Sequence, residues 1–396
     1  YYCSSNLMVW EPLLTKDENN APTGKLVESY FANEDSTVWT FNLKQGVKFH
    51  DGVDFNADAV IANFDRMALG KKSSGFYSLD INKTYPGLLE TNKVDEFTVE
   101  LVFENPLPTL DFSMTDFGSP MFSPNNFDAE GNFNGLPMGT GPFKLVENVI
   151  DEYCMLERND DYYGEKAQTK FIKVRVIADP DTRFAALKSE EIIGVIDLGA
   201  VSPIMGKELV KTGNFVDSSA NSTITHNLIV NGTKAPFNDV KMRQALSILI
   251  DRQLVVDSFY AGIGTPTVNF LNHCTPFYNE YDVTVDVEKA KGLIKEVGSI
   301  DETIKIVLRQ GEIDRYPNKE EAELLQAQLL DAGIKSEIVI LGNSAWSKAM
   351  KEGDYDISIK VLGMSTSEPN TLLKKVMLSG YSLNKSWSIG YSSEYT

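Results

Sequence analysis

The sequence predicts an α/β protein made of two lobes. Its 396 residues exceed the roughly 250–300 residues at which a single hydrophobic core stops growing, so two compact units are expected. Hydrophobic residues make up 42% of the chain, which is enough to fill two such cores. Strand-like and helix-like segments alternate through the second half of the chain, as they do in βαβ units that build a mixed or parallel sheet.

Strands dominate the first part of the chain. Apolar and polar side chains alternate from Trp39 to Leu43, and this period of two is typical of a half-buried strand. We expect that strand over residues 37–49. Asn56 is placed to cap the helix that follows over residues 57–69. Further strands are predicted over residues 97–103, 144–149, 152–158 and 170–177.

From residue 181 onwards helices and strands alternate. The predicted helices cover residues 181–188, 239–250, 319–332 and 344–351, and the predicted strands cover residues 226–230, 304–308, 335–341 and 357–361. The helices are identified by apolar residues that recur every three or four positions. We expect the strands to pair in one sheet with the helices packed against it.

The formal net charge of −19 excludes some classes of partner. With 37 Lys and Arg against 56 Asp and Glu, and no local basic patch, the chain would repel nucleic-acid phosphates and anionic lipid head groups. The longest apolar stretches are far shorter than the roughly 18–20 residues that span a bilayer. The chain opens at Tyr1 without a starting Met, so a trimmed precursor is expected.

The sequence carries no recognisable catalytic or cofactor motif. It has no nucleophile elbow, no zinc-protease helix motif, no phosphate-binding loop and no dinucleotide-binding glycine motif. The three cysteines, Cys3, Cys154 and Cys274, fit neither a disulfide framework nor a zinc spacing, so no metal site and no cofactor are expected. His273 beside Cys274 leaves one enzymatic alternative open, a metal-assisted hydrolase that would also use nearby carboxylates.

Several long motifs resemble one family of binding proteins. In chain order they are WEPLL at 10–14, WTFNLKQGVKFHDG at 39–52, GTGPF at 139–143, RNDDYYGEK at 158–166 and PFNDVKMRQAL at 236–246. Motifs of this length in this order resemble the family 5 (cluster C) extracellular solute-binding proteins of ABC importers, which include oligopeptide-, dipeptide- and nickel-binding proteins. The resemblance covers essentially the whole chain. The residues of these motifs are most similar to those of the nickel-type branch of the family.

The resemblance implies a two-lobed, periplasmic-binding-protein-like α/β fold of type II (cluster C) with an extra N-terminal subdomain. Lobe I would comprise residues 1–225 with that subdomain, and lobe II would comprise residues 226–396. Family members usually continue beyond this point and return to lobe I, so a C-terminal return segment is expected to be missing. The two lobes would close on a solute and hand it to a permease in the membrane.

Location and assembly also follow from the resemblance. A binding protein of this kind works outside the cytoplasm, either in the periplasm or as a lipoprotein at the cell surface. It is expected to be a monomer whose partners are a small-molecule solute and an ABC permease, with no nucleic acid. The resemblance implies that the protein binds its solute without catalysing a reaction, so it is not expected to be an enzyme.

The class of solute stays open between a peptide-like molecule and a metal chelate. The nickel-type branch leads one to look for an arginine near Ser73 and for a histidine late in the chain, yet no histidine follows His273. Oligopeptide-binding relatives place an aspartate near the position of Ser365, which here offers only a hydroxyl. The sequence therefore combines the scaffold of the family with an altered pocket.

The resemblance places the solute pocket between two groups of residues. One side would be formed by Tyr2, Cys3, Phe76 and Tyr77, and the other by Gly363, Met364, Ser365, Thr366 and Ser367. The second group follows the carboxyl end of the predicted strand 357–361, where α/β sheets place their ligands. Gly363 lacks the Cβ that would keep a ligand away from the backbone. Phe76 and Tyr77 have an alternative role as core aromatics at the end of a helix.

Overall fold

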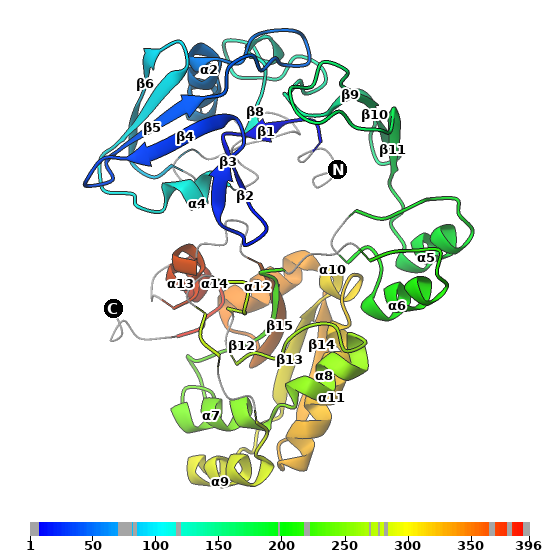
Figure 1. Ribbon diagram of the computed structural model, residues 1–396. Coiled ribbons are helices and arrows are strands. Elements are labelled where there is room, and N and C mark those ends of the chain that lie inside the picture. Colours follow the sequence, from blue (N-terminus) through cyan, green and yellow to red (C-terminus); the bar gives the residue numbers. More distant parts are fainter. Residues whose placement is uncertain are drawn as a thin grey trace. The chain divides into compact units, whose positions relative to one another are not determined.

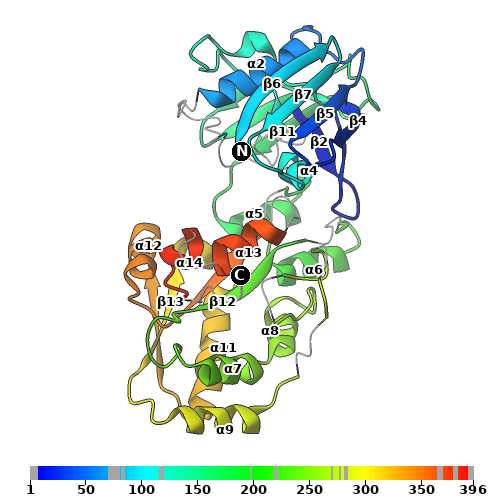
Figure 2. The same ribbon diagram turned by 90° about the vertical axis from the view of Figure 1, so that its left-hand side faces the viewer.

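The computed structural model describes residues 8–69, 81, 85–115, 120–196, 199–217, 222–268, 271–275, 278–280, 284–363, 369–377 and 382–390. The chain forms two compact units, which Figure 1 and Figure 2 show from two directions. Unit 1 comprises Tyr1–Ala178 with Ser365–Ser367, and unit 2 comprises Asp179–Met364 with Glu368–Thr396. Each unit has its own hydrophobic cores, as the length of the chain predicts. No helix of the described residues is both long and apolar enough to cross a bilayer.

Unit 1 contains a four-stranded antiparallel sheet in the order β4-β5-β7-β6. Its strands are β4 (Val27–Ala32), β5 (Val38–Leu43), β6 (Leu88–Asp95) and β7 (Thr98–Phe103). The helix α2 (Ala57–Ala68) packs against β6 and β7 (Figure 2), and Asn56 caps it by accepting the Ala59 N–H at 3.1 Å. Phe41 and Leu43 lie in the same core as the buried face of α2, which confirms the predicted period-two strand and its capped helix.

The strand predicted over residues 37–49 is shorter in the structure. It ends at Leu43, because Gly46 adopts a φ of 73° and turns the chain. Val47 and Phe49 are nevertheless buried, so the alternation of apolar and polar side chains continues beyond the strand. The other predicted strands and helices are confirmed to within a residue or two at each end.

A second part of unit 1 is built on a three-stranded antiparallel sheet in the order β11-β10-β9. Its strands are β9 (Phe143–Val149), β10 (Tyr153–Arg158) and β11 (Phe171–Arg175). The short pair of β1 (Glu11–Pro12) with β8 (Pro120–Met121) and the 3-10 helix η1 (Pro124–Asn126) are the other elements of unit 1 near this sheet in the chain. The pair of β2 (Leu14–Lys16) with β3 (Pro22–Gly24) and the helix α4 (Leu110–Met114) contribute Leu14, Leu110 and Met114 to the core beneath the four-stranded sheet. The core of this second part, which includes Trp10, Phe122 and Leu156, is distinct from the core beneath the four-stranded sheet. Two cores within unit 1 agree with an extra N-terminal subdomain.

A buried carboxylate ties several segments of unit 1 together. The side chain of Glu11 accepts hydrogen bonds from the hydroxyl groups of Tyr162 at 2.8 Å and Tyr163 at 3.0 Å. It also accepts one from Thr140 Oγ1 at 2.9 Å, and its Oε1 lies 3.0 Å from Lys25 Nζ. Burial and the charge of Glu11 raise the pKa of both tyrosines, which therefore remain neutral donors. The motifs at 10–14, 139–143 and 158–166 thus meet at one carboxylate.

The two glycines of the GTGPF motif serve close packing of the backbone. A Cβ atom on Gly139 would lie 2.3 Å from the carbonyl oxygen of Val9, and one on Gly141 would lie 2.5 Å from that of Met8. No side chain larger than hydrogen fits at such distances. Both glycines of the motif are therefore required by the close approach of residues 8–9.

Replacing Glu11 with Gln is expected to destabilise unit 1 by about 3 kcal/mol. The amide removes the charge that Lys25 pairs with and turns one acceptor into a donor facing a tyrosine hydroxyl. Urea unfolding followed by circular dichroism measures the change. Asp54→Asn is the control, since its ion pair with Lys48 is exposed on both sides, and it should change the free energy of unfolding by no more than about 0.5 kcal/mol. Equal effects of the two variants would contradict the prediction.

Unit 2 is built on a four-stranded mixed sheet in the order β12-β15-β13-β14. Its strands are β12 (Thr225–Val230), β13 (Ile304–Arg309), β14 (Ser336–Leu341) and β15 (Ile357–Leu362). The strands β13, β14 and β15 run parallel, and β12 runs antiparallel to β15. One face is covered by α7 (Val240–Leu249), α9 (Val287–Val297) and α11 (Asn318–Asp331), and the other by α12 (Asn343–Glu352), α13 (Pro369–Met377) and α14 (Ser382–Ser386). Helices on both faces explain why the parallel strands are rich in Ile, Leu and Val.

The two units divide at Ala178 and Asp179, earlier in the chain than the predicted lobe boundary at 225/226. The helices α5 (Pro180–Lys188) and α6 (Pro203–Lys211) belong to unit 2 by their contacts. Lys207 donates a hydrogen bond to the carbonyl oxygen of Ala261 at 2.8 Å, and Gly199 packs against the backbone of Arg315. The assignment of residues 179–225 to lobe I stays a prediction.

Candidate functional site

The carboxyl ends of the three parallel strands of unit 2 lie along one edge of the sheet. The antiparallel strand β12 begins at this same edge, since Thr225 pairs with Leu362 and His226 with Val361. Gly363 follows β15 directly. Ligands of α/β sheets bind at this kind of edge, because loops and helix starts gather there around the strand ends. We call it the carboxyl edge of unit 2.

Of the nine predicted pocket residues, the structure describes Gly363. Its backbone lies at the carboxyl edge, where an added Cβ would approach Ile224 Cγ1 to 3.3 Å. The predicted position after a strand end is thereby confirmed for this residue. The remaining residues, Tyr2, Cys3, Phe76, Tyr77, Met364, Ser365, Thr366 and Ser367, lie outside the described residues. Their role in solute binding stays a prediction.

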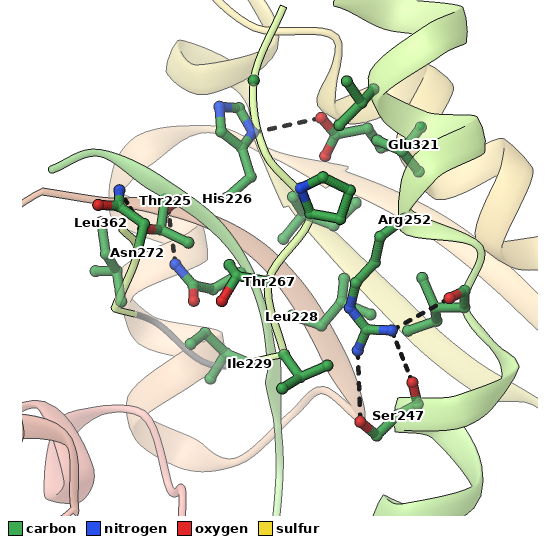
Figure 3. A pocket seen from close by; sticks show the side chains of 18 of the residues that line it. Thr225, His226, Leu228, Ile229, Ser247, Arg252, Thr267, Asn272, Glu321 and Leu362 are labelled. Atoms are coloured by element: carbon green, nitrogen blue, oxygen red, sulfur yellow. Dashed lines mark hydrogen bonds and ion pairs between the residues drawn. The ribbon is translucent and has the colours of Figure 1, made fainter. Parts of the chain in front are cut away.

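A cavity of about 740 Å³ runs along β12 within unit 2 (Figure 3). All six residues of β12 line it, together with residues of α7, α11 and α8 (Arg252–Phe259). Its body is apolar and includes Leu228, Leu246, Ile250, Val256 and Leu325. A volume of this size is typical of small-molecule sites, which are mostly apolar with a few polar groups that orient the ligand.

The polar end of this cavity is formed by His226, Tyr260 and Glu321. His226 Nδ1 lies 3.3 Å from Glu321 Oε1 and 3.0 Å from the hydroxyl oxygen of Tyr260, and that hydroxyl donates a hydrogen bond to Glu321. Burial and the charge of Glu321 raise the pKa of Tyr260, which stays a neutral donor. Figure 3 shows His226 directed toward Glu321. These three side chains satisfy one another and fix the rim of the cavity.

Other polar side chains of the cavity hold its walls. Asn272 donates to the carbonyl oxygens of Ser222 at 2.9 Å and Ile224 at 3.2 Å. Arg252 Nη1 donates to the carbonyl oxygen of Ser247 at 2.7 Å (Figure 3), and burial lowers the pKa of this guanidinium. Because these groups already have partners, the cavity offers a mainly apolar surface.

A second polar cluster lies at the carboxyl edge on the opposite face of the sheet. It consists of Arg309 at the end of β13, Glu312 in α10 (Gln310–Ile313) and Lys360 in β15. Lys360 Nζ contacts the Glu312 carboxylate, whose Oε1 lies 3.8 Å from Arg309 Nη1. Both cations lie over the ring of Trp346, at 5.7 Å for Arg309 and 5.6 Å for Lys360. We call these three charged residues the Arg309 cluster.

The structure gives no support to the hydrolase alternative. Burial raises the pKa of Cys274, which keeps its thiol protonated and weakly nucleophilic. His273 lines the cavity without a partner of the kind that a catalytic base needs among the described residues. Within the same part of the chain, no group of three His, Cys, Asp or Glu side chains is placed to hold a metal ion.

Comparison with known proteins decides the family. The model for bacterial extracellular solute-binding proteins, family 5 Middle, matches residues 21–382. The chain belongs to this family. It is 31% identical to the dipeptide-binding protein of Escherichia coli K12, over 83% of this chain and 65% of the relative. It is 28% identical to heme-binding protein A of Haemophilus influenzae, over 89% of this chain and 68% of the relative.

Solved structures share the fold. NikA from Brucella suis in complex with Fe(III)-EDTA aligns with a TM-score of 0.83 at 24% identity, over 97% of this chain and 79% of that chain. HbpA2 from Haemophilus parasuis aligns with a TM-score of 0.78 at 25% identity, over 98% of this chain and 80% of that chain. The two-lobed α/β fold of the family is therefore confirmed. The chain spans about two thirds of the length of the curated relatives described above, which are binding proteins by name.

The sequence did not single out Tyr260, Glu321, Arg309 or Lys360 as site residues. The rule that placed residues 363–367 at a strand end applies equally to Arg309, which ends β13, and could have found it. Glu321 lies within α11, Lys360 lies within β15 and Tyr260 directly follows α8. Nothing in the local sequence pattern separates these three from ordinary surface residues. Their role depends on partners more than 30 residues away in the chain.

Replacing Glu321 with Gln is expected to lower the free energy of unfolding of unit 2 by roughly 1–3 kcal/mol. The buried acceptor of Tyr260 loses its charge, and the new amide competes with His226 for the hydroxyl. Glu320→Gln is the matched control, because the neighbouring side chain is exposed. Chemical unfolding of the two variants should separate them by at least about 1 kcal/mol. A control as unstable as Glu321→Gln would mean that the cluster does not hold the rim.

Proposed function

We propose that this protein is the substrate-binding component of an ABC importer. It captures a peptide-like solute or a metal chelate between two lobes and delivers the solute to a membrane permease. The observation that carries this proposal is the match of the family over residues 21–382 in a chain with two compact units. The absence of catalytic motifs from the sequence fits capture without turnover.

The solute classes are supported by what related proteins are named for. Curated relatives include the dipeptide-binding protein, glutathione-binding proteins and the nickel-binding periplasmic protein of Escherichia coli. Structures of the same fold hold Fe(III)-EDTA in one case and the peptide STSA in another. Peptides and chelates share polar, carboxylate-bearing surfaces of similar size, so one scaffold can serve both by changing its pocket residues.

The solute contacts the two predicted groups, Tyr2, Cys3, Phe76 and Tyr77 on one side and Gly363, Met364, Ser365, Thr366 and Ser367 on the other. Support comes from Gly363, which lies at the carboxyl edge of unit 2 beside Ile224. The aromatic residues would stack on the solute, and the hydroxyl groups would adapt their hydrogen bonds to it.

The protein works outside the cytoplasm, in the periplasm or as a lipoprotein at the cell surface, and acts as a monomer beside its permease. Membership of an extracellular solute-binding family supports this location. A net charge of −19 keeps such a monomer soluble and disfavours nucleic-acid partners.

Replacing Ser365 with Trp is expected to abolish solute binding while the melting temperature of the ligand-free protein stays within a few degrees. An indole at the carboxyl edge would fill the space for the solute without disturbing a packed core. Isothermal titration with a dipeptide, glutathione and Fe(III)-EDTA identifies a solute and measures the loss. Ser299→Trp is the control, because Ser299 is exposed on the amino-terminal side of β13. Normal solute binding by Ser365→Trp, or loss of its fold, would place the pocket elsewhere.

Uncomplexed Ni²⁺ is expected to bind no more tightly than roughly millimolar. A divalent transition metal needs several nitrogen, oxygen or sulfur ligands, and the described residues offer no such group. Calorimetry with nickel chloride tests this, and nickel with excess histidine tests the chelate separately. A micromolar constant for the bare ion would contradict the prediction.

A further inference from the structure

We infer that His50 is a pH-sensitive switch, which holds the two parts of unit 1 together while its imidazole is neutral and releases them when the imidazole is protonated. The first part is the four-stranded sheet with its core, and the second part is built on the three-stranded sheet with a core of its own. The inference goes beyond the proposed function, because it concerns how unit 1 responds to acid and not which solute is bound.

His50 lies where the two parts of unit 1 meet. Phe49 precedes it and is buried in the core beneath the four-stranded sheet, whereas Phe143 belongs to the core of the second part. The backbone N–H of His50 donates to the carbonyl oxygen of Gly139 at 2.9 Å, and the carbonyl oxygen of His50 accepts from Lys144 Nζ at 3.3 Å. We call these two contacts, together with the contact of the imidazole described next, the His50 junction.

The imidazole of His50 is bound as one tautomer. Its Nε2 lies 2.9 Å from the carbonyl oxygen of Gly141, which also accepts a hydrogen bond from Asn159 Nδ2 at 3.1 Å. A carbonyl oxygen can only accept, so Nε2 carries the hydrogen and Nδ1 carries the lone pair. Nδ1 is buried and has no hydrogen-bond partner among the described residues. A proton added to Nδ1 would therefore find no acceptor.

The surroundings of the ring disfavour its protonation. Burial lowers the pKa of His50 to about 4, and the ammonium group of Lys144 acts in the same direction. The hydrogen bond to the carbonyl oxygen of residue 141 and the charge of Asp51 oppose this shift. Asp51 is exposed, and its carboxylate already accepts hydrogen bonds from Ser123 at 2.7 Å and Asn125 at 3.2 Å. Its charge therefore does not replace the water that a protonated ring would need.

The His50 junction has no room to adapt to a charged ring while it stays closed. Gly139 and Gly141 pack so closely on residues 8–9 that a Cβ atom on either glycine would lie within 2.5 Å of a backbone oxygen. The segment 139–143 therefore cannot shift far enough to bring water to Nδ1 without losing these contacts. Protonation is expected to open the junction as a whole.

The direction of the pH effect follows from the two states of the ring. The pKa of His50 is about 4 in the closed junction and returns to its ordinary value of 6.5 once the ring reaches water. The neutral ring therefore stabilises the junction fully above about pH 6.5, and this stability is lost as the pH falls toward about 4. At about pH 5 the ratio of open to closed molecules should exceed its value at neutral pH by at least about tenfold.

The first test observes the ring itself. Long-range ¹H–¹⁵N NMR spectra of the wild-type protein report which imidazole nitrogen carries the hydrogen and at which pH the ring becomes charged. The tautomer with hydrogen on Nε2 is expected at neutral pH, and His50 should stay neutral down to about pH 5. Hydrogen on Nδ1 at neutral pH, or a ring that is already protonated at about pH 6, would overturn the inference.

The second test observes the junction by hydrogen exchange and mass spectrometry. Protection of the amides in residues 48–52 and 139–144 is measured at neutral pH and at about pH 5, after correction for the pH dependence of chemical exchange. His50→Gln keeps a donor for the carbonyl oxygen of Gly141 and cannot be protonated in this range. His273→Gln is the matched control, because His273 is exposed and lies in unit 2.

Between neutral pH and about pH 5, protection should fall at least about tenfold in the wild type and in His273→Gln, and by less than about threefold in His50→Gln. His50→Asn, which is also neutral at every pH, replaces His50→Gln if the latter does not fold. Constant protection in the wild type, or a fall of the same size in the wild type and in the His50 variant, would overturn the inference.

Discussion

The buried carboxylate of Glu11 is the interaction on which the second part of unit 1 depends. Removing a charge from water costs several kcal/mol unless partners replace the solvent, and here three hydroxyl groups and one ammonium group do so. Those partners come from segments up to 152 residues away from Glu11 in the chain. The motifs at 10–14, 139–143 and 158–166 therefore contribute to the packing of unit 1 through their contacts with Glu11.

In unit 2 the middles of the strands contribute mainly to the hydrophobic cores, and charged side chains lie at the strand ends. The middle of β13 is apolar on both faces, with Ile306 in one hydrophobic core and Val307 in the other. In β15 the buried Ser358 lies between Ile357 and Ile359 and donates a hydrogen bond to the carbonyl oxygen of Val307 at 2.7 Å. Charged groups gather at the strand ends on both faces of the sheet. On the α11 face they satisfy one another around Glu321 and stiffen the rim of a cavity. On the α12 face the carboxylate of Glu312 pairs with Lys360 and lies 3.8 Å from Arg309 Nη1.

Burial raises the pKa of the Cys274 thiol, and burial together with the charge of Glu321 raises the pKa of the Tyr260 hydroxyl, so both side chains stay protonated. Polar side chains that are already held by hydrogen bonds within the protein lose little conformational entropy when a ligand binds, and such preorganisation favours selective binding.

Local pattern in the sequence determined the elements and the family. Alternation around Trp39, the cap at Asn56 and the apolar spacing of α7 and α11 are short-range signals, and the corresponding strand and helices are where they predict. Gly363 directly follows β15, where the sequence predicts a strand end. The tertiary structure alone decided the strand order β12-β15-β13-β14, the meeting of His226 with Tyr260 and Glu321, and the pairing of Arg309 with Glu312 and Lys360. The physical reason is that periodicity states which face of an element is buried, whereas the choice of neighbour depends on packing between elements that lie far apart in the chain.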